Sequence, residues 1–144
     1  MKPGNGKRET GNVGAVLVVV LGVAACRGPA VSVRIVEPAD GATLGEPGVR
    51  VVLQAAGIEI APAAEQRTGT AHHHLFLDTD VTPAGDTIPA GVTGIIHLGR
   101  AQTGFTFDSV APGAHRLIAV LADAWHVAHP SWRTDTVRFV VGTR

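Results

Sequence analysis

The chain has 144 residues, with twelve Lys plus Arg against twelve Asp plus Glu, so its formal net charge is zero when the histidines are neutral. This balance, without a basic stripe, argues against nucleic acid as a partner. Cys26 is the single cysteine, which excludes an intramolecular disulfide and leaves a hydrophobic core to hold the fold.

The first 25 residues have the pattern of an export signal. A positively charged start precedes the apolar segment 13–25, which is too short to span a bilayer because a spanning helix needs about 20 residues. The segment ends in Val23-Ala24-Ala25-Cys26, the small-residue pattern of a bacterial lipobox. We therefore expect 1–25 to be a lipoprotein signal peptide, Cys26 to carry the lipid and 26–30 to include a short tether. An ordinary secretory signal with a chance cysteine, or a short anchor, is the alternative.

The residue after the cysteine predicts where such a lipoprotein goes. Arg27, rather than Asp, follows Cys26, and in Gram-negative lipoproteins this usually indicates export to the outer membrane. We expect an exported protein whose lipid anchor holds it to the membrane, on the periplasmic side of the cell envelope.

Residues 31–144 have the pattern of one domain built from about seven short strands. Polar and apolar residues alternate at 31–36, where β-branched residues are frequent, and Gly and Pro supply the turns between later apolar runs. The other predicted strands are 49–56, 73–78, 94–98, 103–110, 114–122 and 134–141. Since no helical period is evident, the sequence predicts an all-β fold, a single immunoglobulin-like antiparallel β-sandwich.

One turn resembles the corner found in such sandwiches. Pro112-Gly113-Ala114-His115 precedes a strong apolar run, and His115 stands where immunoglobulin-like domains place a tyrosine. An imidazole nitrogen can bond nearby backbone as a tyrosine hydroxyl does, so we interpret His115 as structural.

Six of the seven histidines lie in three places, and the first is the run His72-His73-His74. Side chains alternate along a strand, so His72 and His74 share one face while His73 and Leu75 share the other. Residues two apart on a strand are about 6.6 Å apart, close enough for two imidazoles to bind one ion. We expect the Leu75 face to be the core face, His73 to be partly buried and hydrogen-bonded, and His72 and His74 to be free to reach a ligand. A solvated tract without function is the alternative, and a one-residue shift of register would exchange the faces.

The second place is the loop segment Trp125-His126-Val127-Ala128-His129-Pro130-Ser131-Trp132. Two histidines three residues apart in a loop can both point at one ion, as in zinc sites of the His-x-x-His kind. The two tryptophans bracket them and would supply apolar walls, which strengthen metal–ligand contacts. A hydrophobic plug, with Trp side chains as anchors, is the alternative.

His97, the third place, lies in an apolar strand and is interpreted as a core histidine unless the other clusters converge on it. His73, Asp78 and Asp123 are candidates to hydrogen-bond and orient ligating rings.

Several ordered blocks together resemble a known family. They are the triple-histidine segment Gly69 to Asp78, the segment Ile96 to Thr103 around His97, the corner Pro112 to His115, and the segment Asp123 to Pro130. This series is similar to a bacterial exported family known as domain of unknown function 4399, over about Val49 to Val141. The resemblance implies an extracytoplasmic protein but no activity. Members often have Gly-Asp before the loop pair, where this chain has Ala122-Asp123.

The favoured hypothesis is a cell-envelope lipoprotein that binds Zn(II) or Cu(II) through His72, His74, His126 and His129, with His97 as a fifth candidate. Cys26 would carry lipid and Met1 would leave with the signal, so no soft sulfur ligand favours Cu(I).

Two other functions stay open from the sequence. A structural or adhesive module could use the histidines as a buried hydrogen-bond network, which specifies a core when every member is satisfied. A metalloenzyme is the least favoured, because the chain has no His-Glu-x-x-His motif and no nucleophile elbow. Glu59 and Glu65 precede the triple histidine, but their spacing does not place them near it.

Overall fold

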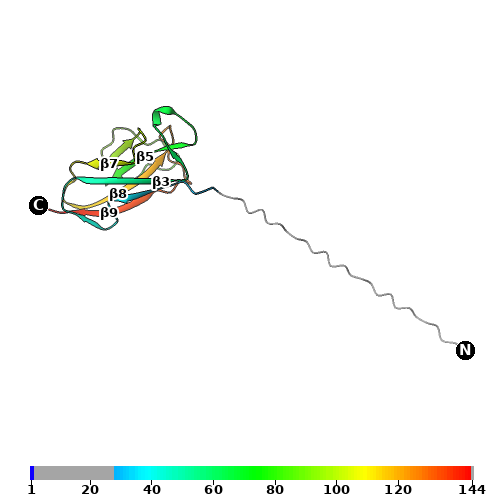
Figure 1. Ribbon diagram of the computed structural model, residues 1–144, viewed down its shortest axis with the longest axis horizontal. Coiled ribbons are helices and arrows are strands. Elements are labelled where there is room, and N and C mark those ends of the chain that lie inside the picture. Colours follow the sequence, from blue (N-terminus) through cyan, green and yellow to red (C-terminus); the bar gives the residue numbers. More distant parts are fainter. Residues whose placement is uncertain (2–27, 144) are drawn as a thin grey trace.

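Nine strands and one short 3-10 turn form the regular structure of Met1 and residues 28–143, the part of the chain that the computed structural model describes (Figure 1). The elements are β1 (Ser32–Glu37), β2 (Ala42–Leu44), β3 (Val49–Ala56), β4 (Glu59–Ile60), η1 (Ala63–Glu65), β5 (Thr70–Leu77), β6 (Ile95–Leu98), β7 (Gly104–Phe107), β8 (Gly113–Ala122) and β9 (Asp135–Val141). The predicted lipidation site Cys26 and, apart from Met1, the predicted signal peptide lie outside the described residues. Within those residues, no helix has the length and apolar character needed to cross a membrane.

Two sheets pack against each other. The first has the strand order β1-β3-β7, and the second has the order β2-β9-β8-β5-β4, with β6 also paired to β5. The long pairings are antiparallel, whereas the short strands β2 and β4 pair in parallel with β9 and β5. Strands β1, β3 and β7 take the places of strands A, B and E of an immunoglobulin-type sandwich, and β5, β8 and β9 those of C, F and G. The predicted all-β sandwich is confirmed.

The strand boundaries differ from the sequence-based expectation at one functionally important place. Strand β5 begins at Thr70 rather than at His73, because Thr70 and Ala71 pair with Glu59 and Ile60 of β4. The short strands β2 and β4 are not predicted from the sequence, since two or three residues are too few to show alternation. The triple histidine therefore lies inside a strand and not at its start.

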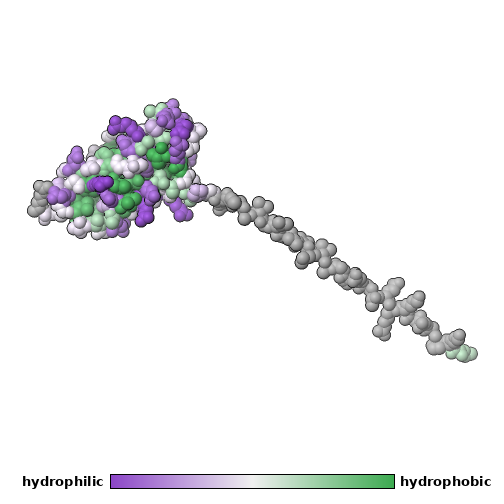
Figure 2. Space-filling model, viewed as in Figure 1, coloured by the Kyte–Doolittle hydropathy of each residue, from purple (hydrophilic) through white to green (hydrophobic). Residues whose placement is uncertain are grey.

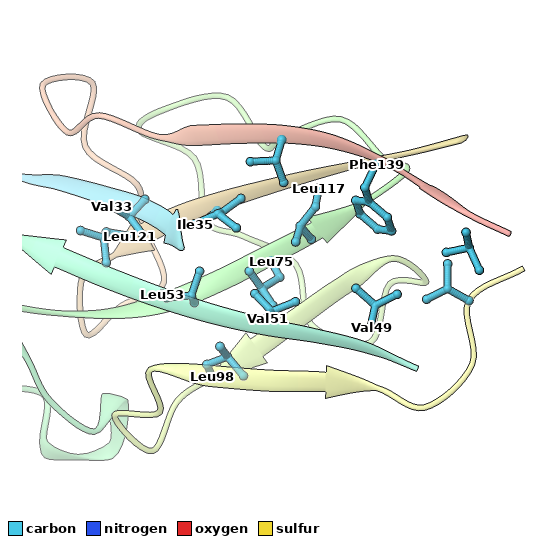
Figure 3. Packing of buried hydrophobic residues seen from close by; sticks show 14 of the residues in the cluster. Val33, Ile35, Val49, Val51, Leu53, Leu75, Leu98, Leu117, Leu121 and Phe139 are labelled. Atoms are coloured by element: carbon cyan, nitrogen blue, oxygen red, sulfur yellow. The ribbon is translucent and has the colours of Figure 1, made fainter. Parts of the chain in front are cut away.

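The core between the sheets comes from alternate residues of the long strands. Val49, Val51 and Leu53 of β3 point toward Leu75 of β5 and Leu117 of β8 (Figure 3). Each fully buried side chain of this kind stabilises the fold by about 1.5–3 kcal/mol relative to exposure. On the visible face of the domain, hydrophilic and hydrophobic residues are interspersed (Figure 2). The sandwich thus has a core of its own, without a disulfide.

A second apolar cluster covers the outer face of the second sheet. Phe76 of β5 packs there with Ile118 and Val120 of β8 and with Ile88 and Ala128 from two loops. The loops are tied together by backbone hydrogen bonds from Gly85 to Ala128 and from Ile88 to His126, each 2.8 Å. Both faces of β5 are consequently buried, whereas the sequence predicts one face in the core and the face of His72 and His74 open to a ligand.

His115 makes the corner contact expected from its place before the body of β8. Its Nε2 donates to the carbonyl oxygen of Ala111 and its Nδ1 donates to Oδ2 of Asp78, both at 2.7 Å. Burial opposes protonation of this ring, but the Asp78 carboxylate and the Ala111 carbonyl outweigh it and raise the pKa of His115. Asp78 also accepts the backbone N–H of Arg116 at 2.9 Å, so this carboxylate holds the corner together and does not orient a clustered ring.

Candidate metal centre

Three imidazoles of the candidate site come from neighbouring strands of the second sheet. His72 and His74 lie on the same face of β5, and the β5–β6 pairing places His97 directly opposite His74. On the other side of β5, His72 and His74 lie opposite Ala122 and Val120 of β8. The register of the sheet therefore brings the three rings to one region of its outer face, beside the second apolar cluster.

The fourth imidazole comes from the loop between β8 and β9, whose fold depends on Asp123. Oδ1 of Asp123 accepts the backbone N–H groups of Trp125 at 2.9 Å and Val127 at 3.0 Å, and its carbonyl oxygen accepts the N–H of His126 at 2.9 Å. His126 has φ = 66°, a left-handed conformation that histidine adopts more readily than most residues. This turn folds the loop back over the sheet and brings the His126 ring to the other three.

Ring nitrogens of the four residues lie close together, and two of the contacts join Nε2 atoms. Nε2 of His72 lies 2.9 Å from Nε2 of His74, and Nε2 of His97 lies 3.2 Å from Nε2 of His126. One potential ligand atom from each of the four residues lies within 4.8 Å of all the others. Four nitrogens bound tetrahedrally to one ion at about 2.0–2.1 Å are separated by roughly 3.3 Å. The two short separations, 2.9 and 3.2 Å, are therefore near the tetrahedral value, and the 4.8 Å limit permits the other pairs to be wider.

Burial keeps the inner rings neutral. His72 and His74 are 1% and 2% exposed, whereas His97 is exposed and His126 is half-buried. Burial, reinforced by the neighbouring rings of His97 and His126, lowers the pKa of His72 to about 4. Burial and the His72 ring lower the pKa of His74 to about 3, and burial and the His126 ring lower that of His97. At neutral pH these three rings are therefore uncharged, so a metal ion that binds them does not have to displace a proton from an imidazolium group.

Two buried nitrogens in the site are without partners. Nδ1 of His72 and Nδ1 of His74 make no hydrogen bond to any described residue. A metal-free cluster can pair its four Nε2 atoms as two hydrogen bonds, but that pairing leaves these two Nδ1 atoms unsatisfied at about 1–3 kcal/mol each. Ion binding at the Nε2 atoms offsets such a cost, whereas two hydrogen bonds between neutral rings contribute only about 0.5–1.5 kcal/mol each.

Gly99 is a positioning residue that the sequence analysis did not identify. A side chain at this position would collide with the His97 ring, at Cε1 and Nε2. The absence of a Cβ two residues after His97 thus leaves the space that the ring occupies when it turns toward the cluster. A glycine two residues after the histidine, directly past the end of the predicted strand, is the signal that could have indicated it, since residues two apart in extended chain point to the same side.

Two other histidines with sequence-predicted roles lie outside the four-ring group. His73 points to the opposite face of β5, is fully buried, and donates from Nδ1 to the carbonyl oxygen of Gln102 at 3.0 Å. Nε2 of His129 lies 3.2 Å from Oδ2 of Asp123, and the His129 ring packs on Trp132 with ring centroids 4.5 Å apart. The structure therefore assembles His97 with three of the four histidines first favoured as ligands, and it leaves His129 out.

The tryptophans do not form the expected walls around the pair of loop histidines. Trp125 is 50% exposed, and Trp132 packs against His129 and the core between the sheets. The apolar surroundings of His72 and His74 come instead from the second cluster, through Val120 and Ala122 opposite them.

Comparison with protein families identifies the family of the chain. A family model described as a domain of unknown function (DUF4399) matches residues 51–142, a segment that contains all four converging histidines. The chain belongs to this family. No curated protein matches it. The resemblance seen in the sequence is confirmed, and because the DUF4399 description names no activity, the geometry of the four rings carries the functional argument.

Gly99→Ala is expected to weaken zinc binding without destabilising the metal-free fold. The new methyl group displaces the His97 ring, so zinc affinity should fall at least about tenfold, or roughly 1.4 kcal/mol. Gly99 has no left-handed φ, so the free energy of unfolding without metal should change by less than about 1 kcal/mol. Calorimetric zinc titration and urea unfolding measure the two effects.

Gly45→Ala is the matched control for this substitution, because a Cβ at Gly45 meets nothing within 4 Å. Unchanged zinc affinity in Gly99→Ala would show that the His97 ring is not a ligand.

Proposed function

We propose that this DUF4399 protein is an exported cell-envelope lipoprotein that binds a divalent transition metal, Zn(II) or Cu(II), through His72, His74, His97 and His126. The observation that carries the proposal is that four imidazoles from two strands and a loop each place a ring nitrogen within 4.8 Å of those of the other three. Imidazole is a common ligand for both ions. The site would store, buffer or deliver the ion, or fasten the loop to the sheet.

The surroundings of the rings support binding rather than catalysis. The group that could hold an ion consists of four histidines without a carboxylate. Asp123, whose charge is felt at His72, is engaged by the backbone of its own loop and by His129. A metal-activated water would need a free coordination position and a nearby base, and the four rings supply neither.

The alternative is a structural module in which the same rings form a metal-free hydrogen-bond network. The two short Nε2 contacts favour it, since each can be a hydrogen bond between neutral imidazoles of complementary tautomers. This alternative predicts that chelators leave thermal stability unchanged. Metal binding predicts the reverse, because a ligand specific for the folded state adds about 2.7 kcal/mol at a hundred times its Kd.

Zinc titration of the chain from Arg27 onward tests the proposed function, because this part contains the whole sandwich core. We expect one equivalent to bind with a Kd below about 10 μM. His126→Ala removes one of four ligands and should weaken binding at least about tenfold. His129→Ala, in the same loop but outside the ring group, should change the Kd less than about twofold.

Binding of both Zn(II) and, in a parallel titration, Cu(II) weaker than about 10 μM would reject the metal site in favour of the hydrogen-bond network. Equal losses in His126→Ala and His129→Ala would reject the proposed ligand set.

The anchoring proposal rests on the lipobox pattern and is tested separately. Cys26→Ser removes the thiol that would be lipidated, so the protein should move from the membrane fraction to the soluble periplasmic fraction of an expressing Gram-negative cell. Fractionation with immunoblotting measures this shift. Equal membrane association of the wild type and Cys26→Ser would contradict lipid anchoring.

A further inference from the structure

The geometry points to a closed, tetrahedral zinc site, in which four protein nitrogens saturate the ion and leave no position for water or substrate. This inference rests on the proposed metal binding and adds the identity of the ion and the shape of its coordination. It distinguishes Zn(II), which favours four tetrahedral ligands, from Cu(II), which favours a planar or tetragonal arrangement.

The separations between ring centroids indicate a tetrahedron. The three sheet rings, His72, His74 and His97, form a nearly equilateral triangle with sides of 4.8, 4.9 and 5.0 Å. The His126 ring lies 5.0, 5.8 and 4.8 Å from these three. Five of the six separations thus agree within 0.2 Å, and the sixth is longer by less than 1 Å.

Metal–nitrogen bond lengths allow these separations to be compared with the two coordination shapes. With an ion about 2.05 Å from each Nε2, a ring centroid lies roughly 3.2 Å from the metal. Tetrahedral binding then gives six centroid separations of about 5.2 Å, whereas square-planar binding gives four of about 4.5 Å and two of about 6.4 Å. Five of the observed separations, 4.8–5.0 Å, lie between about 4.5 and about 5.2 Å, and the sixth, 5.8 Å, is below the roughly 6.4 Å of a square's diagonal. Because a square needs two such long separations and only one is found, the tetrahedral arrangement fits better.

The strand pairings oppose rearrangement to a plane. His72 and His74 are fixed two residues apart on β5, and His97 is fixed opposite His74 by the β5–β6 ladder. A square would require two of these three rings to lie across a diagonal, about 40% farther apart than neighbours, yet the three sides of the triangle are nearly equal. His126 comes from the covering loop and completes the set from outside the sheet.

The burial pattern gives the ion a direction of entry. His72 and His74 are almost fully buried, whereas His97 is exposed and His126 is half-buried. An ion from solvent therefore meets His97 and His126 first and is then bound by all four rings, with the loop of His126 closing the site. A saturated site whose outer ligands are reached from solvent suits storage or delivery of zinc, or fastening of the loop to the sheet, and does not suit hydrolysis.

Cobalt substitution tests the coordination shape, since Co(II) replaces Zn(II) and its visible spectrum depends on coordination number. The metal-free wild-type protein, loaded with one equivalent of Co(II), should show the intense visible absorption of four-coordinate cobalt. One equivalent of Zn(II) should abolish it. His129→Ala should retain the intense band, and His126→Ala, which opens a position to water, should lose it.

A weak spectrum typical of six-coordinate cobalt in the wild type would overturn the closed site, even where zinc titration shows tight binding. A cobalt band that one equivalent of Cu(II) removes but Zn(II) does not would overturn the assignment to zinc. Failure of Co(II), Zn(II) and Cu(II) all to bind would instead reject the proposed metal function itself. His97→Ala provides a second ligand variant if circular dichroism shows that His126→Ala does not fold, and it should lose the intense band in the same way.

Discussion

The pairing of β5 with its two neighbours is the constraint on which the site depends. Between β6 and β8, β5 is held in a register that puts His97 opposite His74 and apolar residues opposite both inner histidines. A slip of one residue would send His72 and His74 into the core and bring His73 to the outer face. Burial of Leu75 between the sheets opposes that slip, so the hydrophobic core fixes the geometry of a polar site.

Burying two imidazoles has a cost that the rest of the fold must offset. Desolvation holds the pKa of His72 and His74 far below the ordinary value, and their Nδ1 atoms are without partners. Two buried imidazoles with unpaired Nδ1 atoms destabilise the fold unless a favourable interaction at their Nε2 atoms, such as metal binding, offsets this cost. A loop ordered by Asp123 and a glycine at position 99 both serve to direct the remaining rings to the same point.

The sequence predicts the class of fold and most of the site, because both leave local signals. Alternation and turn residues mark the long strands, and the triple histidine and the loop pair mark three of the four residues in the ring group, His72, His74 and His126. Strand pairing is not local, so the sequence could not show that His97 lies opposite His74 and joins the group. Nor could it show that His129 turns to Asp123 and Trp132, because the Asp123 turn and the left-handed His126 decide where each loop ring points. The covering of the outer face by Ile88 and Ala128 arises from two loops without periodic pattern.

Anomalous diffraction from a zinc-loaded crystal, recorded at the zinc absorption edge, is the most direct test of the central claim. We expect one strong peak about 2.0–2.1 Å from Nε2 of each of His72, His74, His97 and His126. A peak beside His129 and Asp123 instead, or no peak among the four rings, would contradict it.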